Sequence, residues 1–384
     1  MARPLFDALR EALDGLVRAT ARTTPGAPHV RDAIDGRRVQ LVYVVALLPT
    51  TFAGVWNVGH QANLVLADIG WATASGWRSG LRAVLCSGGP SVASDLLHGL
   101  LYFLPIYAVC FVVGLFWETL FAAVRERPLR EGLWTTALLF ALTLPPLVPL
   151  WQVALGMTFG VVVAQELFGG YGRHVLNTAL VGRTFLYYAY PDGISGDAVW
   201  VAVDGYTAAT PLAALSAADI DIGLDTLSET WRDAFVGNLP GSMGETSTAA
   251  ILLGAAILLY TGVASWRVMV SMVVGGAGTA ALLGLVGGEA NVMYGVPPAW
   301  QLVLGSFAFG TVFFAPDPVT SAQTDRGRWI YGLLVGVLAI LLRVTNPGLP
   351  EGVMIAVLLG NIFAPAIDWT VEEANIRRRA KRHG

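Results

Sequence analysis

The sequence predicts an all-α polytopic membrane protein with about ten transmembrane helices, because it is rich in apolar runs and poor in charge. Of its 384 residues, 55% are hydrophobic and only 13% are charged, and its mean hydropathy is +0.60. Soluble domains are roughly 25% charged, whereas long apolar runs with few charges are typical of membrane-spanning helices. Prolines and glycines interrupt several runs, so we expect some spans to be broken.

The chain begins with a segment, residues 1–38, that we interpret as cytoplasmic and amphipathic. Leu5, Leu9 and Leu13 recur at helical spacing with charged residues between them. This pattern is typical of a helix that lies on a membrane surface or on a partner. No cleavable signal peptide is expected, because the first apolar run begins only near Val39.

Ten spans fit the apolar runs, in two transmembrane halves at 39–189 and 248–368. The expected spans are 39–56, 97–121, two within 133–167, 174–190, 248–264, 268–286, 299–315, 329–344 and 352–368. At about 1.5 Å per residue and a hydrocarbon core of about 30 Å, 133–167 is long enough for two crossings, with Pro145, Pro146 and Pro149 at the turn. A polar loop, 190–247, separates the halves, and a basic tail, 369–384, ends the chain.

The placement of basic residues predicts the orientation. Ten spans put both termini on the same side of the membrane. If that side is the cytoplasm, 19 of the 24 basic residues fall in cytoplasmic segments, which is the bias that membrane proteins usually show. We therefore expect a multi-pass protein of a bacterial inner membrane with both termini cytoplasmic and the loop 190–247 in the periplasm.

Two segments resemble each other and suggest an internal repeat. Residues 149–160 read PLWQVALGMTFG, and residues 298–310 read PAWQLVLGSFAFG. Chance similarity between glycine-rich helices explains the pair about as well, and the symmetry of such a repeat stays open. Paired segments that are broken by Gly and Pro nevertheless point to a site near the middle of the membrane.

Within the polar loop, a run of small residues surrounds one threonine, Thr210. Asp204-Gly205 is a turn signal, and Thr210 before Pro211 is suited to be the N-cap of a short helix.

Each ionisable or amide group in or near the spans has both a structural and a functional interpretation. Glu118 either reaches the cytoplasmic interface or serves in function, and Arg183 is suited to an ion pair between helices. Asp317 and Asp368 fall at cytoplasmic span ends, where carboxylates either end helices or bind a hard cation. Asn177 and Asn361 are expected inside spans, as helix–helix hydrogen bonds or ligand contacts.

Several classes of function are not supported by the sequence. It contains no phosphate-binding loop and no dinucleotide fingerprint between a strand and a helix. Its five histidines are scattered singly and its two cysteines have no metal-ligand spacing. We expect neither ATP hydrolysis nor NADH binding by this chain, no protein-bound metal centre and no nucleic-acid partner.

Many short motifs, in order along nearly the whole chain, carry a family resemblance. They are HVRD at 29–32, YFLPIY at 102–107, FWE at 116–118, LWQ at 150–152, FGVVVA at 159–164, FGG at 168–170, GNLPGS at 237–242, ASWR at 264–267, DPV at 317–319 and NIRRR at 375–379. Together they resemble the B-subunit family of sodium-translocating NADH:quinone reductases.

The resemblance implies two flavins. In that family, the last residue of a Ser-Gly-Ala-Thr string carries FMN through a phosphoester, and here the string is TAAT, ending at Thr210 and preceded by Asp204. Thr207 and Ala208 depart from the family's string but stay small, so we expect the modification to survive. A threonine hydroxyl is a poor nucleophile, which is why a dedicated flavin transferase is implied. A noncovalent riboflavin near Asn177 is implied as a second electron carrier.

The resemblance also implies a substrate, an ion and partners. Ubiquinone is expected near Gly114, Leu115 and Glu118, where Leu115 replaces the family's usual second glycine. Sodium is expected along a path that includes Asp368 and Glu118, with Asp317 as a weaker candidate. The implied partners are the other subunits of a six-subunit membrane complex.

Two other functions remain open. One is the D subunit of the related ferredoxin:NAD oxidoreductases, which shares the flavin threonine but generally lacks the long N-terminal extension. The other is a channel or carrier without redox chemistry, for which ten broken spans would suffice. A carrier gives no reason for a small-residue threonine motif on an outer loop. A purely structural scaffold is the least favoured alternative.

Overall fold

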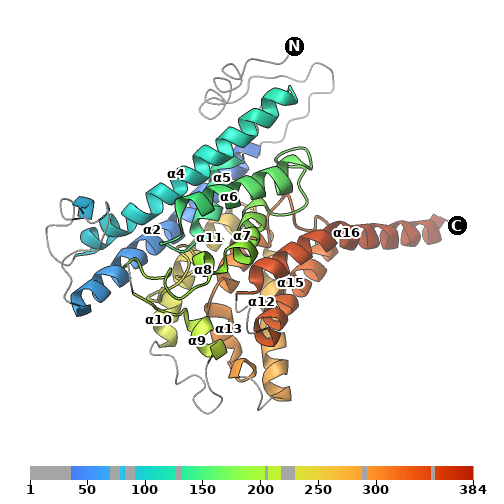
Figure 1. The fold of residues 1–384 in the computed structure, drawn as a ribbon. Coiled ribbons are helices and arrows are strands. Elements are labelled where there is room, and N and C mark those ends of the chain that lie inside the picture. Colours follow the sequence, from blue (N-terminus) through green and yellow to red (C-terminus); the bar gives the residue numbers. More distant parts are fainter. Residues whose placement is uncertain are drawn as a thin grey trace.

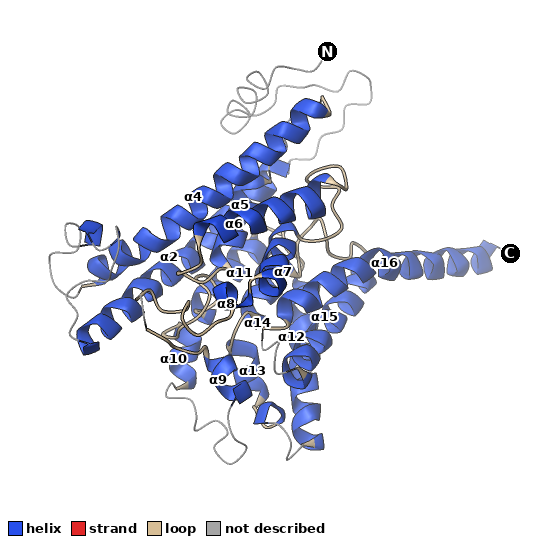
Figure 2. Ribbon diagram, in the orientation of Figure 1, coloured by secondary structure: helices blue, strands red, loops and turns tan. Residues whose placement is uncertain are grey.

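All regular elements that the structure describes are helices. The computed structural model describes residues 36–69, 78, 80–82, 91–126, 132–203, 206–217, 230–287, 292–346 and 351–383, and these residues contain no strand (Figure 2). The helices are α2 (Gly36–Ile69), α4 (Val92–Val124), α5 (Leu133–Leu142), α6 (Leu150–Phe159), η1 (Gly160–Glu166), α7 (Thr178–Ala189), α8 (Pro191–Ile194), α9 (Pro211–Ala217), α10 (Trp231–Val236), α11 (Thr248–Tyr260), α12 (Trp266–Val286), η3 (Val292–Tyr294), α13 (Pro298–Val303), α14 (Phe307–Phe309), η4 (Gly310–Phe314), α15 (Asp325–Thr345) and α16 (Val353–His383). The predicted all-α class is confirmed for the described residues. The predicted amphipathic segment 1–38 lies almost wholly outside them.

Five of these helices, α2, α4, α12, α15 and α16, are long and apolar enough to cross a membrane. Four of them contain a predicted span, and α16 covers all of the tenth span except residue 352. The other five predicted spans fall on shorter elements, namely α5, α6 with η1, α7, α11 and the group α13, α14 and η4. A multi-pass membrane protein is therefore supported, and ten crossings stay a prediction.

Helices α2 and α4 form a long pair that lies side by side in Figure 1. Both exceed the predicted spans, since α2 has 34 residues and α4 has 33. Glycines bring the two backbones together: a Cβ at Gly59 would collide with the carbonyl of Asp95, and one at Gly99 would collide with the carbonyl of Val55. Small residues allow this close approach of helices in membranes.

The two similar sequence segments also share a backbone feature. In the first, α6 continues into η1, a π-helix that begins at Gly160. In the second, α13 and α14 lead to η4, a π-helix that begins at Gly310. Between α13 and α14 the chain turns at Gly305, whose φ is +65°. The segments are therefore alike in local structure as well as in sequence. A repeat of whole halves stays a prediction.

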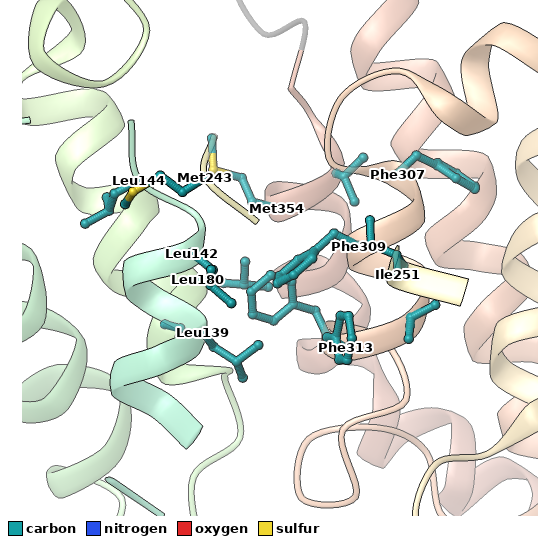
Figure 3. Packing of buried hydrophobic residues seen from close by; sticks show 14 of the residues in the cluster. Leu139, Leu142, Leu144, Leu180, Met243, Ile251, Phe307, Phe309, Phe313 and Met354 are labelled. Atoms are coloured by element: carbon teal, nitrogen blue, oxygen red, sulfur yellow. The ribbon is translucent and has the colours of Figure 1, made fainter. Parts of the chain in front are cut away.

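The hydrophobic core joins the two halves. In Figure 3, Phe309 and Phe313 of the second broken segment face Leu142 and Leu180 of the first half. All four side chains are buried. The helices that carry function are therefore packed around a shared interior and not in two separate bundles.

Helix α16 is longer than the predicted tenth span. It continues without a break to His383 and projects to the C-terminus at the right of Figure 1. The expected boundary between span and tail at Asp368 is thus not a helix end. Asn361, on the same helix, accepts a hydrogen bond from Tyr331 of α15 at 2.8 Å, which is the helix–helix contact expected of an amide there.

The polar loop 190–247 holds only short helices in its described part. Residues Val199 to Val203 are buried although they form no regular element. Tyr102 of α4 donates a hydrogen bond to the carbonyl of Ala202 at 3.1 Å, and Asn57 of α2 donates one to the carbonyl of Leu239 at 2.7 Å. These contacts fix the loop against one end of the α2–α4 pair.

Candidate functional site

Thr210 begins helix α9, as its sequence predicts. Its Oγ accepts a hydrogen bond from the backbone N–H of Ala213 at 3.2 Å, and Pro211 takes the first helical position. The side chain is 6% exposed. A hydroxyl offers one donor and two acceptor positions, and no described residue accepts the proton of Thr210. The oxygen can therefore form an ester and still cap the helix.

A cleft opens at Thr210, and we call it the Thr210 cleft. Its empty space, including open solvent, is about 390 Å³. Its lining is mainly apolar and comes from the loop, α13 and the segment before α16: Thr210, Pro211, Leu212, Leu239, Pro240, Gly241, Ser242, Glu245, Thr246, Val303, Leu304, Gly305 and Glu351. The buried hydroxyl of Thr246 has no hydrogen-bond partner among the described residues. A free donor beside an esterifiable threonine fits a phosphate group.

The cleft borders a buried ion-pair cluster. Arg183 of α7 lies 3.2 Å from Glu245 and also pairs with Glu351, so an ion pair is confirmed for Arg183, but its partners lie outside helices and not on another helix as expected. It also donates to the carbonyl of Thr143. Burial raises the pKa of Glu245 to about 7, although Arg183 opposes the shift.

A second buried arginine holds the break in the other half. Arg343 of α15 donates to the backbone and side-chain oxygens of Gln301 at 2.6 and 3.0 Å and to the carbonyl of Leu304 at 3.1 Å. These oxygens lie at the end of α13, where no helical N–H follows to bind the carbonyls. Arg343 thus fixes the backbone that carries Leu304 and Gly305 into the Thr210 cleft.

The other members of the threonine motif are less constrained. Thr207 is exposed, and the following Ala208 donates to the carbonyl of Asp197 at 2.8 Å. Asp204 lies outside the described residues. Thr207 does not line the Thr210 cleft.

A second cleft lies around Asn177 and Asp317, and we call it the Asn177 cleft. Its empty space is about 380 Å³, and its lining is polar and aromatic: Gln40, Tyr43, Thr135, Thr136, Leu139, Tyr171, His174, Asn177, Thr178, Ala179, Phe313, Asp317 and Pro318. Two buried atoms of this lining, Gln40 Oε1 and His174 Nδ1, have no partner among the described residues. Unpaired buried polar atoms are costly, so they fit a ligand with hydroxyl and amide groups.

The expectation that Asn177 lies inside a span is wrong. Asn177 is the N-cap of α7, where its Oδ1 accepts from the N–H groups of Ala179 and Leu180 at 3.1 and 3.3 Å. Its Nδ2 donates to Asp317 at 3.0 Å. The preceding residues form an irregular loop and not a helix, because the glycines at 169, 170 and 172 take positive φ values. Asn177 thereby links the two halves.

Two other groups of the Asn177 cleft are held neutral. Burial, followed by the nearby carboxylate of Asp317, raises the pKa of Tyr171 well above its usual range. Burial lowers the pKa of His174. The cleft therefore offers a phenol, an imidazole and one carboxylate.

The predicted quinone residues lie on α4. Gly114 and Glu118 share the buried face, where Gly114 meets Leu133 and Met157, and Leu115 is half-buried beside them. Glu118 Oε1 accepts from Gln165 of η1 at 2.7 Å, and Gln165 accepts from Thr178 at 3.4 Å. Since Thr178 lines the Asn177 cleft, a hydrogen-bond chain joins Glu118 to that cleft.

The three predicted sodium residues do not share one site. Glu118 binds Gln165, and Asp317 accepts from Asn177 and from the N–H of Val319 at 2.9 Å. Asp368 accepts from the N–H groups of Gln323 and Thr324 at 2.6 and 2.9 Å and from the hydroxyl of Thr324 at 2.5 Å, at the start of α15. In the described part of the chain, no group of three or more His, Cys, Asp or Glu side chains could hold a metal ion.

Sequence reasoning missed Glu245 and Glu351, which line the Thr210 cleft, and Gln165 and Arg343, which bind residues of or near the clefts. Glu245 and Glu351 lie in stretches with no helical or strand pattern, so the sequence gives no indication that they approach Arg183. For Gln165 and Arg343 the sequence does give an indication, because a polar side chain in an apolar run needs a partner.

Comparison with known proteins gives a consistent result over almost the whole chain. The family model described as "NQR2, RnfD, RnfE family" matches residues 23–377. The chain is similar to the B subunit of the Na(+)-translocating NADH-quinone reductase of Azotobacter vinelandii, with 48% identity over 98% of this chain and 94% of that protein. The same-named proteins of Chromohalobacter salexigens and Pseudomonas aeruginosa are 50% and 48% identical, over 98% of this chain and 92% and 94% of theirs.

Proposed function

Because the chain belongs to the NQR2, RnfD, RnfE family, we propose that it is a membrane redox subunit of a sodium-translocating NADH:quinone reductase. In this role it receives electrons that other subunits take from NADH, and it passes them to ubiquinone while sodium is exported. The observation that carries the proposal is the hydroxyl of Thr210, which borders a cleft and has no acceptor for its proton among the described residues.

Thr210 is proposed to carry FMN through a phosphoester. The fit rests on the free proton of Thr210, on the unpartnered hydroxyl of Thr246 and on the apolar walls of Leu212, Leu239 and Val303. When bound, a flavin exchanges electrons singly or in pairs, which suits transfer between NADH-derived pairs and single-electron carriers. The chain supplies position: α9 fixes the ester oxygen, and Arg343 fixes the opposite wall.

The Asn177 cleft is proposed to hold the noncovalent riboflavin. Its support is the pair of unpartnered buried atoms, Gln40 Oε1 and His174 Nδ1, among rings and hydroxyls. Such groups can bind the hydroxyls of a ribityl chain and the edge of a flavin ring. Asn177 itself is engaged with α7 and Asp317, so its role is to shape the cleft.

Ubiquinone is proposed to bind near Gly114, Leu115 and Glu118. The hydrogen-bond chain through Gln165 and Thr178 connects this face of α4 with the Asn177 cleft. A short separation between an electron carrier and its acceptor is what the proposed transfer requires. Glu118 Oε2 has no partner among the described residues, which leaves one oxygen to interact with a substrate.

The proposed setting is a bacterial inner membrane, with the termini in the cytoplasm, Thr210 outside, and the other subunits of a six-subunit complex as partners. Contacts at opposite ends of α2 support this orientation. Gln40, near its start, donates to Tyr171 beside Arg173, whereas Gln61, towards its end, donates to Asn238 at 3.0 Å beside the Thr210 cleft. A flavin transferase outside the cytoplasm would then have access to Thr210.

The flavin proposal is tested by in-gel fluorescence. The complex is expressed with its flavin transferase, denatured and viewed under ultraviolet light. We expect a fluorescent band of this subunit in the wild type and in Thr210→Ser, and none in Thr210→Ala. Absence of fluorescence in the wild type, or its persistence in Thr210→Ala, would refute the attachment site and favour a carrier without redox chemistry.

The sodium proposal concerns Asp368, Glu118 and Asp317, of which Asp368 gives the sharpest test. Asp368→Ala should weaken the sodium stimulation of quinone reduction and leave the flavin attached. Asp368→Asn removes the charge and keeps one oxygen that can accept from Thr324, although the N–H of Gln323 loses its acceptor. Loss of stimulation in both variants supports an ionic role, whereas an unchanged apparent sodium affinity in both removes Asp368 from the path.

A further inference from the structure

Two carboxylates that line the Thr210 cleft, Glu245 and Glu351, pair with one guanidinium behind it. Arg183 lies 3.2 Å from Glu245 and pairs with Glu351, and the exposed fractions of the three side chains are 2%, 5% and 12%. Buried charges interact strongly because little water screens them. The cluster is therefore sensitive to any charge that enters the cleft.

Around Glu245, the buried positive charges do not outnumber the buried negative charges. Arg343 of α15 is buried and binds the oxygens of Gln301 and Leu304, and it has no carboxylate within ion-pair distance in the described part of the chain. Its charge is felt by Glu245 and Glu351 at longer range. Ser242 is the near polar neighbour of Glu245, and Tyr187 faces Arg183. Two cations thus face two carboxylates.

A flavin ester on Thr210 would upset this balance. A phosphodiester there would keep an ionised oxygen, and an electron that entered a bound flavin without a proton on its ring would add a further negative charge. Negative charge close to a buried carboxylate favours the protonated carboxyl group. Glu245 and Glu351 both line the cleft, but Glu245 is the more deeply buried of the two.

We propose that Glu245 is the proton-accepting group of the Thr210 cleft, and that it takes up a proton when the cleft gains an electron. The inference rests on the proposed function, since the charge comes from a flavin on Thr210. In the forward step, one electron from the reduced partner subunit enters the cleft and one proton from water binds the Glu245 carboxylate. When the electron leaves towards quinone, the O–H bond breaks and the proton returns to water.

The ordinary state of Glu245 is suited to this role. Burial raises the pKa of Glu245 above the usual range of a carboxyl group, although Arg183 opposes the shift. Burial thus already disfavours the ionised carboxylate, and negative charge that enters the cleft would disfavour it further.

The test is a redox titration of the whole complex with dithionite between pH 6 and 8. Subtracting the Thr210→Ala complex isolates the flavin on Thr210. In the wild type we expect the midpoint potential to become more negative as pH rises, by up to about 59 mV for each tenfold drop in proton concentration. In Glu245→Gln this slope should fall by at least half, with the flavin still fluorescent in gels.

Infrared difference spectroscopy gives a second readout that does not depend on activity. Reduction of the wild type should add a carbonyl-stretch band of a protonated carboxyl group, absent from Glu245→Gln and retained in Glu351→Gln, the matched control. If the wild type carries flavin but shows no such band, the inference is wrong and the proposed function stands. If Thr210 carries no flavin, both fall.

The design does not depend on the folding of the variants. Should Glu245→Gln fail to assemble, the wild type alone decides: a pH-independent potential together with no carboxyl band overturns the proposal. A band that disappears in Glu351→Gln but not in Glu245→Gln overturns it as well, because the proton would then belong to the other carboxylate.

Discussion

At the scale of single residues, Thr210 shows how a structural and a chemical role coexist on one oxygen. Its sequence context predicts the N-cap, and the hydrogen bond from Ala213 confirms it. The same context does not reveal that Thr246 leaves its hydroxyl unpaired beside it, because the two residues meet only through the folding of the loop. The cap is therefore predictable from sequence, and the cleft is not.

Arg183 gives the residue-scale prediction. Replacing Arg183 with Met leaves Glu245 and Glu351 buried together without a cation at ion-pair distance, and breaking a buried pair in this way costs about 3–5 kcal/mol. We expect the free energy of unfolding of the solubilised complex to fall by that amount, measured by denaturant titration. Adding Glu245→Gln should restore part of the loss, because one of the unpaired charges is removed.

Arg232 is the control for this experiment, since it is exposed on α10. Arg232→Met should change the free energy of unfolding by less than about 0.5 kcal/mol, as surface substitutions usually do. Equal losses for Arg183→Met and Arg232→Met would show that the cluster contributes no specific stability.

At the scale of elements, apolar length predicts the long helices well and the broken ones poorly. Five predicted spans correspond to long helices, because a run of about 20 apolar residues is a strong local signal. The segment 299–315 instead divides into α13, α14 and η4. Its break at Gly305 is stabilised by Arg343 from α15, and this long-range contact leaves no trace in the local pattern. Asn177 was misplaced for a different, local reason, because glycines at positive φ keep the preceding residues out of a helix.

The contact between α2 and α4 gives the element-scale prediction. A methyl group at Gly99 would collide with the backbone of Val55, and overpacking of this kind typically costs about 1–3 kcal/mol. Gly99→Ala should therefore lower the melting temperature of the solubilised complex. Gly278→Ala is the matched control, because a Cβ at this α12 glycine meets no atom within 4 Å. Its melting temperature should stay equal or rise, since alanine favours helix by about 1 kcal/mol.

At the scale of the whole molecule, the structure joins the two halves through a few polar links and a shared core. Asn177 bridges to Asp317, and Arg183 of the first half pairs with Glu351 of the second. The sequence predicts the halves and the residues between them from hydropathy alone. It does not predict which residues cross-link them, because such contacts join positions more than a hundred residues apart. The orientation in the membrane is the whole-molecule property that the sequence predicts and that an experiment can decide directly.

Cysteine labelling tests this orientation. In a background with Cys86 and Cys110 replaced by serine, a single cysteine is placed at Thr207 or at Ile376, both of which are exposed. Intact spheroplasts are treated with a membrane-impermeant maleimide. Because 19 of the 24 basic residues fall in the segments assigned to the cytoplasm, we expect Thr207→Cys to react at once and Ile376→Cys to react only after permeabilisation. The reverse order would invert the topology and place the Thr210 cleft on the cytoplasmic side, beyond the reach of an extracytoplasmic flavin transferase. Labelling of both sites in intact spheroplasts would instead put an even number of crossings between them and rule out the ten-span arrangement, which has five.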